Sequence, residues 1–155
     1  MLSEFYKQEK IERTDKYIVF VMLVVLCITP IITYKYISMV NSPIPMDNKF
    51  GTGIKADIFN FYKAIIVYLG TGMIFSLFIY KISVLKYTIK PGKFNILLAI
   101  LSIGIVFSVL FSQYKNIELM GNFDRSELAL SWLCYIIILF VLYNTKIENK
   151  YFKTF

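Results

Sequence analysis

The chain contains no histidine, which excludes every catalytic or metal-binding scheme that depends on an imidazole ring. Only two cysteines are present, Cys27 and Cys134, and each lies inside an apolar stretch. A cysteine in such a setting ordinarily acts as a small buried hydrophobic residue, and a disulfide or a shared metal is the alternative. We therefore expect no metal site and no cofactor.

Charged residues are also scarce. They make up 17% of the 155 residues, against about a quarter in an ordinary soluble domain, whereas hydrophobic residues make up 57%. The net charge of +7 comes mostly from lysines that lie between and beside apolar stretches rather than on one periodic face. This distribution does not indicate a nucleic-acid-binding protein, and it predicts that most of the chain lies in lipid.

Four apolar stretches have about the length that a membrane crossing needs. The sequence predicts spans over residues 18–37, 64–80, 94–112 and 128–143. The first is too long for the apolar part of a signal peptide and follows acidic residues, so we expect a retained anchor. The predicted fold class is all-α, a polytopic membrane protein with a single membrane domain over residues 1–155.

Two features modify the first span. Residues 1–16 alternate in charge, which suits a short surface helix before the membrane. Pro30 lies inside the predicted span and should kink it, with Thr29 and Thr33 near enough to satisfy the backbone carbonyls that a proline leaves unpaired. An ordinary kink and a functional hinge are both compatible with this pattern.

The lysine and arginine residues beside the spans predict the orientation. The two tails and the loop over residues 81–93 together carry eleven, against six near the loops over residues 38–63 and 113–127. Because basic residues are retained on the cytoplasmic side, both ends and the loop 81–93 should be cytoplasmic, and the other two loops extracytoplasmic. The four lysines of the loop 81–93 are explained as a topology signal, with a lipid-phosphate site as the alternative.

Small residues recur every four positions on two of the predicted spans. They are Gly72 and Ser76 on the second span, and Gly104, Ser108 and Ser112 on the third. Such stripes allow helix backbones to approach closely, so we expect them to face each other or another helix. A substrate groove lined by glycine is the alternative.

The search for residues that could carry chemistry yields one group of charged side chains. No predicted span carries an acidic or basic residue near the bilayer midplane, which argues against a proton-coupled transporter. Asp124, Arg125 and Glu127 lie together just before the last span. Asp124 and Glu127 have the spacing of a helix capping box, whereas Arg125 could also pair with the phosphates of a polyprenyl carrier or contact a glycan.

The segment 111–127, followed by an apolar stretch with Cys134 and Tyr135, resembles O-antigen ligase and polymerase-like membrane proteins. These proteins commonly show Phe-Ser, then Leu-x-Gly, then Arg-x-Glu before the next span, and residues 55–63 are similar to the acidic and aromatic segment before their second span. Leu128 departs from the usual glycine. Family members also have about ten or more spans and a large outer loop with a catalytic arginine, to which nothing here corresponds, so no catalytic residue is carried over.

The resemblance implies a protein of the bacterial plasma membrane that transfers or polymerises glycan from an undecaprenyl-linked carrier. Our leading hypothesis is a truncated or split member of this family, inactive alone, whose partners are the lipid bilayer and further transmembrane helices. The second hypothesis is a stand-alone four-helix interaction or accessory protein. A small transporter ranks last, because no intramembrane charge supports it.

Overall fold

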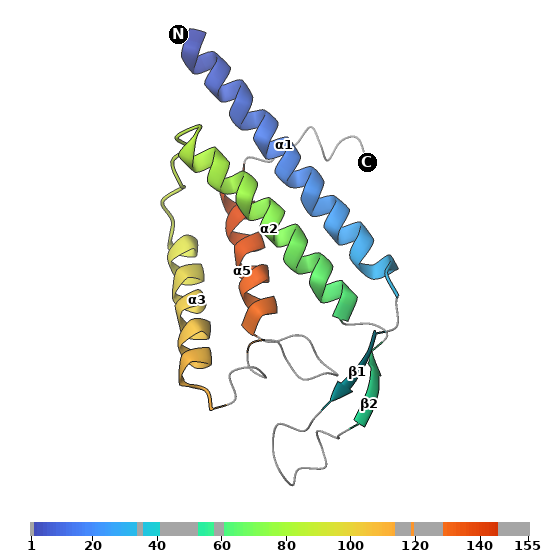
Figure 1. Ribbon diagram of the computed structural model, residues 1–155. Coiled ribbons are helices and arrows are strands. Elements are labelled where there is room, and N and C mark those ends of the chain that lie inside the picture. The colour runs from blue at the N-terminus through green and yellow to red at the C-terminus, as the bar shows by residue number, and fades with distance from the viewer. Residues whose placement is uncertain are drawn as a thin grey trace.

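The computed structural model describes residues 2–33, 36–40, 53–57, 61–113, 119 and 129–145. Its elements, in chain order, are α1 (Leu2–Ile31), β1 (Tyr36–Val40), β2 (Gly53–Asp57), α2 (Phe61–Ser83), α3 (Lys93–Phe111) and α5 (Ala129–Asn144). The four helices run in alternating directions, and the two strands lie below one end of the bundle (Figure 1). The predicted helical architecture is confirmed, with a short strand pair that the all-α prediction did not include.

Three of the helices are long and apolar enough to cross a membrane: α1 from Glu4, α2 and α3. The chain is therefore a membrane protein. Helix α5 has only 16 residues, which is about 24 Å at 1.5 Å per residue, against about 30 Å of hydrocarbon in a bilayer. A fourth crossing and the orientation of the termini stay predictions.

Helix α1 differs from its prediction at both ends. The expected surface helix and the first span form one uninterrupted helix of 30 residues, about 45 Å long, whose N-terminal part extends past the end of α2 (Figure 1). The helix ends at Ile31 rather than at residue 37. Pro30 lies in the last turn, where the missing N–H and the clash of the ring with the preceding turn end the helix instead of kinking it. Thr29 Oγ1 donates to the Val25 oxygen at 2.6 Å, whereas the carbonyl that lacks its donor because of Pro30 is that of Leu26, four residues earlier.

Strands β1 and β2 pair in antiparallel fashion, from Tyr36 opposite Asp57 to Val40 opposite Gly53. Residues 36 and 37, which the prediction assigned to the first span, therefore belong to β1. The apolar composition of this segment extends the hydrophobic stretch beyond Pro30, but composition does not reveal that the backbone has changed from helix to strand. The ladder brings the ends of α1 and α2 together at this end of the bundle (Figure 1).

The core forms where α1 and α5 both pack on α2. Ile18 of α1, Ile74 and Phe78 of α2, and Val141 of α5 are fully buried there. The buried residues of α2 and the turn after it recur at alternating spacings of three and four, at Thr71, Ile74, Phe78, Lys81 and Leu85. This is the spacing of a helix face that packs between neighbouring helices, so Lys81 lies on the core side of α2.

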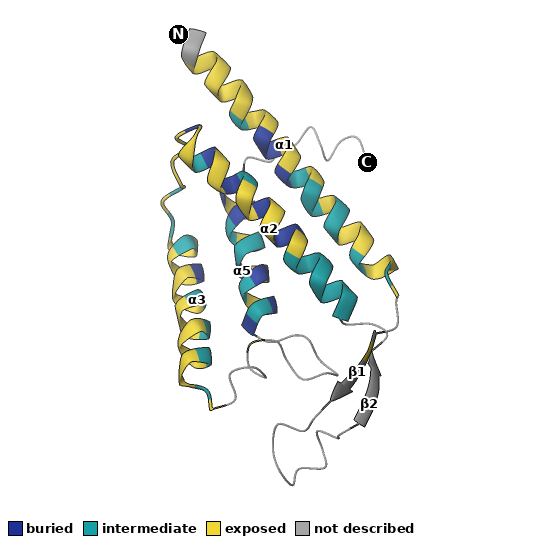
Figure 2. Ribbon diagram, viewed as in Figure 1, coloured by how far each residue is buried: buried dark blue, intermediate teal, exposed yellow. Residues whose placement is uncertain are grey.

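Helix α3 lies at the edge of the bundle and packs on α5. Leu98 is its one buried residue, and most of its surface is exposed (Figure 2). Phe94 of α3 contacts Tyr143 of α5 with ring centroids 4.9 Å apart. Helices α1, α2 and α5 thus make a compact group, to which α3 is attached along one side.

Candidate functional site

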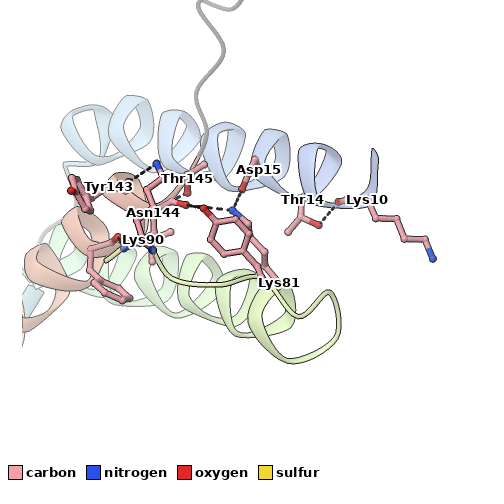
Figure 3. Close-up of polar contacts among 11 residues, drawn as sticks. Lys10, Thr14, Asp15, Lys81, Lys90, Tyr143, Asn144 and Thr145 are labelled. Carbon is pink, nitrogen blue, oxygen red and sulfur yellow. Dashed lines mark hydrogen bonds and ion pairs between the residues drawn. The ribbon is translucent and has the colours of Figure 1, made fainter. Parts of the chain in front are cut away.

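A buried ion pair joins α1 to α2. The Lys81 Nζ donates to Asp15 Oδ1 at 2.6 Å, and the side chains are 0% and 3% exposed, respectively. Within the described part of the chain, these are the two charged residues that are buried. Sixty-six positions separate them in the sequence, so only the packing of α1 against α2 brings the charges together (Figure 3).

Lys81 is also covered by the turn that follows α2. Lys86 adopts a left-handed backbone conformation with φ of 49°, and the Tyr87 N–H donates to the Lys81 carbonyl at 3.3 Å. The chain therefore folds back over the end of α2 and places the Tyr87 ring 3.7 Å from the Lys81 Nζ. A cation at this distance from an aromatic face is stabilised by the electron-rich ring, and the ring also keeps water from the ammonium.

Asn144, the last residue of α5, connects this pair to α3. Its carbonyl accepts from the Tyr87 hydroxyl at 3.0 Å and lies 3.5 Å from the Lys81 Nζ. Its side-chain Oδ1 accepts from the Lys90 N–H at 3.1 Å, and its Nδ2 donates to Asn95 Oδ1 at 3.1 Å and to the Phe140 carbonyl at 2.8 Å. We refer to Asp15, Lys81, Tyr87, Lys90, Asn95 and Asn144 as the polar cluster.

The two buried charges of the polar cluster neutralise each other. Each of the two buried charges has the other at hydrogen-bond distance, which is the arrangement in which buried ions are tolerated. The pKa of the Tyr87 phenol is raised from its ordinary value, mainly by burial and secondly by the negative charge of Asp15. The phenol therefore stays protonated and keeps donating to the Asn144 carbonyl at physiological pH.

The polar cluster contains a residue from each of α1, α2, α3 and α5. Asp15 belongs to α1, Lys81 to α2, Asn95 to α3 and Asn144 to α5. Removing any one of these groups leaves a buried polar partner without its bond, which costs more than an exposed contact would. The arrangement thus holds the ends of α2, α3 and α5 in one geometry against the middle of α1.

The outer cluster predicted from the sequence cannot be compared with this geometry. Asp124, Arg125 and Glu127 lie outside the described residues. The capping box and the carrier contact suggested for them therefore stay predictions, as does most of the segment on which the family resemblance is based.

The small-residue stripes are on the outside of the bundle. Gly72 and Gly104 are exposed, and a Cβ added to either would have no atom within 4 Å. Ser76 and Ser108 are exposed as well, and Ser112 is half-buried. The two stripes therefore do not face each other, which corrects one form of the prediction; the other form, a helix outside the described residues, stays a prediction.

The close approach between helices occurs two residues before the predicted stripe on α2 begins. A Cβ on Gly70 would clash with the side chain of Val25, so Gly70 is the glycine that allows α1 to pack against α2. Gly70 lies next to Thr71 on the face that includes Ile74 and Phe78. In the structure Ile74 and Phe78 mark the core face of α2, whereas the four-residue repeat of small residues marks a different, exposed face.

The polar cluster itself was missing from the sequence prediction. Lys81 was assigned to a cytoplasmic connector and Asp15 to a surface helix, because each lies just outside an apolar stretch. A signal was present, since Lys81 follows Ile74 and Phe78 at helical spacings and Asp15 precedes Ile18 by three residues. Extending the apolar faces by one turn in each direction would have placed both charges inside.

The fold defines the class of this protein as a helical membrane protein in which the polar cluster joins the helices near one end of the bundle. Comparisons of the chain with family models, with curated proteins and with solved structures found no match in any of the three. The resemblance to glycan ligases and polymerases is therefore a hypothesis based on the sequence segments alone.

Proposed function

We propose that this chain is one part of a larger membrane assembly, in which further transmembrane helices cover α3. The observation that carries the proposal is the position of α3 at the edge of the bundle. It is 19 residues long and apolar, and one of its residues is buried. A helix that contributed only to the fold of this chain would be expected to bury a continuous face against its neighbours.

The stripes of small residues support the same proposal. Gly104 and Ser108 are exposed on α3, and the space beside Gly104 is open. In lipid there is no hydrophobic drive between helices, so association depends on close packing, which small residues allow. Gly72 and Ser76 form a second such surface on α2.

The polar cluster prepares α3 for this role. Asn95 binds Asn144, and its Nδ2 also donates to the Lys90 carbonyl at 2.8 Å. These bonds hold the first turn of α3 in a defined place while its outer face stays exposed. A partner helix would then meet a preorganised surface, which lowers the entropy lost on association.

For the identity of the assembly, we propose a glycan ligase or polymerase of the bacterial plasma membrane. The segments 55–63 and 111–127, which resemble that family, support this proposal. The additional helices beside α3 would then be the later spans of such an enzyme, supplied by another chain or by more of the same protein. The alternative is an accessory protein that docks on an unrelated membrane complex through the same face.

The docking face can be tested with a pair of neighbouring substitutions on α3. Gly104→Leu fills the proposed contact, and Ile103→Leu changes an exposed apolar residue on another face of the helix. We expect the complex extracted from native membranes in mild detergent to lose mass with Gly104→Leu and to keep it with Ile103→Leu. A wild-type chain that runs as a monomer under these conditions would contradict the proposal.

The glycan assignment needs a separate readout. Cells that lack this protein should produce surface polysaccharide of altered amount or chain length, and the wild-type gene should restore it. Arg125→Gln should fail to restore it, whereas Lys115→Gln, in the same predicted loop, should succeed. Normal polysaccharide in cells without the protein would leave docking on an unrelated complex as the function.

A further inference from the structure

An apolar groove of about 660 Å³ is lined by side chains of α1, α2 and α5. Helices α1 and α5 both pack on α2, so α2 forms the floor of the groove and the other two helices form its walls. The wall on α1 runs from Val19 to Pro30, and the floor on α2 runs from Lys63 to Ile74. The groove therefore follows the long axis of the bundle rather than crossing it.

The length of the groove corresponds to one leaflet. Val19 and Pro30 are eleven positions apart, as are Lys63 and Ile74, which is about 16 Å along a helix. Half of the hydrocarbon core of a bilayer is about 15 Å. A single acyl chain of a membrane lipid would thus lie along the groove with its polar end at one end of it.

The charge at the two ends decides where that polar end lies. Lys63 is the one charged residue among the described residues that line the groove. It lies in the first turn of α2, where the helix dipole adds further positive potential, and next to Phe61 and Tyr62, which are residue types of the membrane interface. The opposite end of the groove lies one turn from Asp15, whose charge is already paired with Lys81.

We propose that the groove binds one acyl chain of an anionic phospholipid, with the lipid phosphate beside Lys63. The apolar walls hold the chain through contact area, and the lysine selects for a negatively charged headgroup. A single lysine near the membrane surface accounts for about a fivefold preference for an anionic lipid over a zwitterionic one. The bound lipid fills the space between α1 and α5 that the side chains leave open.

Native mass spectrometry of the purified protein in detergent tests this proposal. The protein is titrated with phosphatidylglycerol and with phosphatidylcholine of the same acyl chains. We expect one retained lipid per 18.1 kDa chain, with phosphatidylglycerol bound about fivefold more tightly. Equal affinity for the two lipids would overturn the assignment of the headgroup site.

Two pairs of variants separate the chain site from the headgroup site. Lys63→Gln should abolish the headgroup preference, whereas Lys93→Gln, an exposed lysine at the start of α3, should keep it. Val67→Phe, which fills the groove, should remove the retained lipid, whereas Leu69→Phe, at a residue 63% exposed on the same helix, should not. Circular dichroism checks that each variant is folded. If Val67→Phe proves unfolded, the comparison of the lysine variants decides the proposal, and loss of the preference in Lys93→Gln instead would overturn it.

Discussion

Replacing only one member of the ion pair between Asp15 and Lys81 should lower the stability of the fold far more than replacing both members by apolar residues. Lys81→Met keeps a long apolar side chain but leaves the Asp15 carboxylate, 3% exposed, without its ammonium. Loss of one partner from a buried pair typically costs about 3–5 kcal/mol, whereas replacing both by apolar residues is neutral or stabilising. The double variant Asp15→Leu with Lys81→Met should therefore recover most or all of the stability lost in the single variant.

Thermal unfolding in detergent, followed by circular dichroism, measures this difference. For a chain of this size about 2–4 °C corresponds to each kcal/mol, so Lys81→Met should lower Tm by about 6–20 °C. Lys86→Met, at an exposed lysine five positions later, is the matched control and should leave Tm unchanged. The rate of alkylation of the buried Cys134, measured in a Cys27→Ser background, reports opening of the bundle independently.

Two results would refute this reasoning. A shift in Tm below about 2 °C for Lys81→Met would mean that water reaches the pair and that it behaves as a surface ion pair. A double variant as unstable as the single variant would mean that the shape of the two side chains matters and their charges do not.

Three further predictions concern the contacts around the cluster and the core. Gly70→Ala should lower stability by about 1–3 kcal/mol through overpacking against Val25, and Gly72→Ala should be neutral or stabilising, as compared by Tm. Tyr87→Phe should cost about 1 kcal/mol, because it removes the hydroxyl bond to Asn144 and keeps the ring. Burial raises the pKa of the Tyr87 phenol. The stability that the protonated phenol gives the fold is therefore complete below the unfolded pKa of about 10, and it is lost as pH rises through the higher folded pKa. An absorbance titration should show a late-ionising tyrosine signal that is absent in Tyr87→Phe. Asn144→Ala should cost about 1–3 kcal/mol and should speed hydrogen exchange in the first turn of α3.

The features that the sequence predicted correctly depend on local composition. The positions of the helical stretches, the approximate bounds of α3 and α5, and the membrane environment all follow from the length and hydrophobicity of single segments. Apolar side chains favour lipid wherever they occur, so these features need no knowledge of the neighbours. The end of α1 was also recoverable, because Pro30 carries the signal that ends a helix, but the apolar residues after it outweighed that signal in the prediction.

Which face of a helix is buried was harder to predict. On α2 the small residues Gly72 and Ser76 and the buried residues Ile74 and Phe78 define two different faces. In water the apolar face would identify the core, but every face of a membrane helix is apolar, so hydrophobicity no longer distinguishes inside from outside. The distinction came only from the helices that pack against α2.

The sequence by itself determined that this is a helical membrane protein, because the free energy of placing apolar segments in lipid depends on those segments alone. The tertiary structure decided that Asp15 and Lys81 form a pair, that Tyr87 covers it, and that α1, α2 and α5 leave a groove beside Lys63. Each of these joins groups that are far apart in the chain, and their free energy depends on the distance between them and on the exclusion of water. Both quantities exist only after the helices have packed.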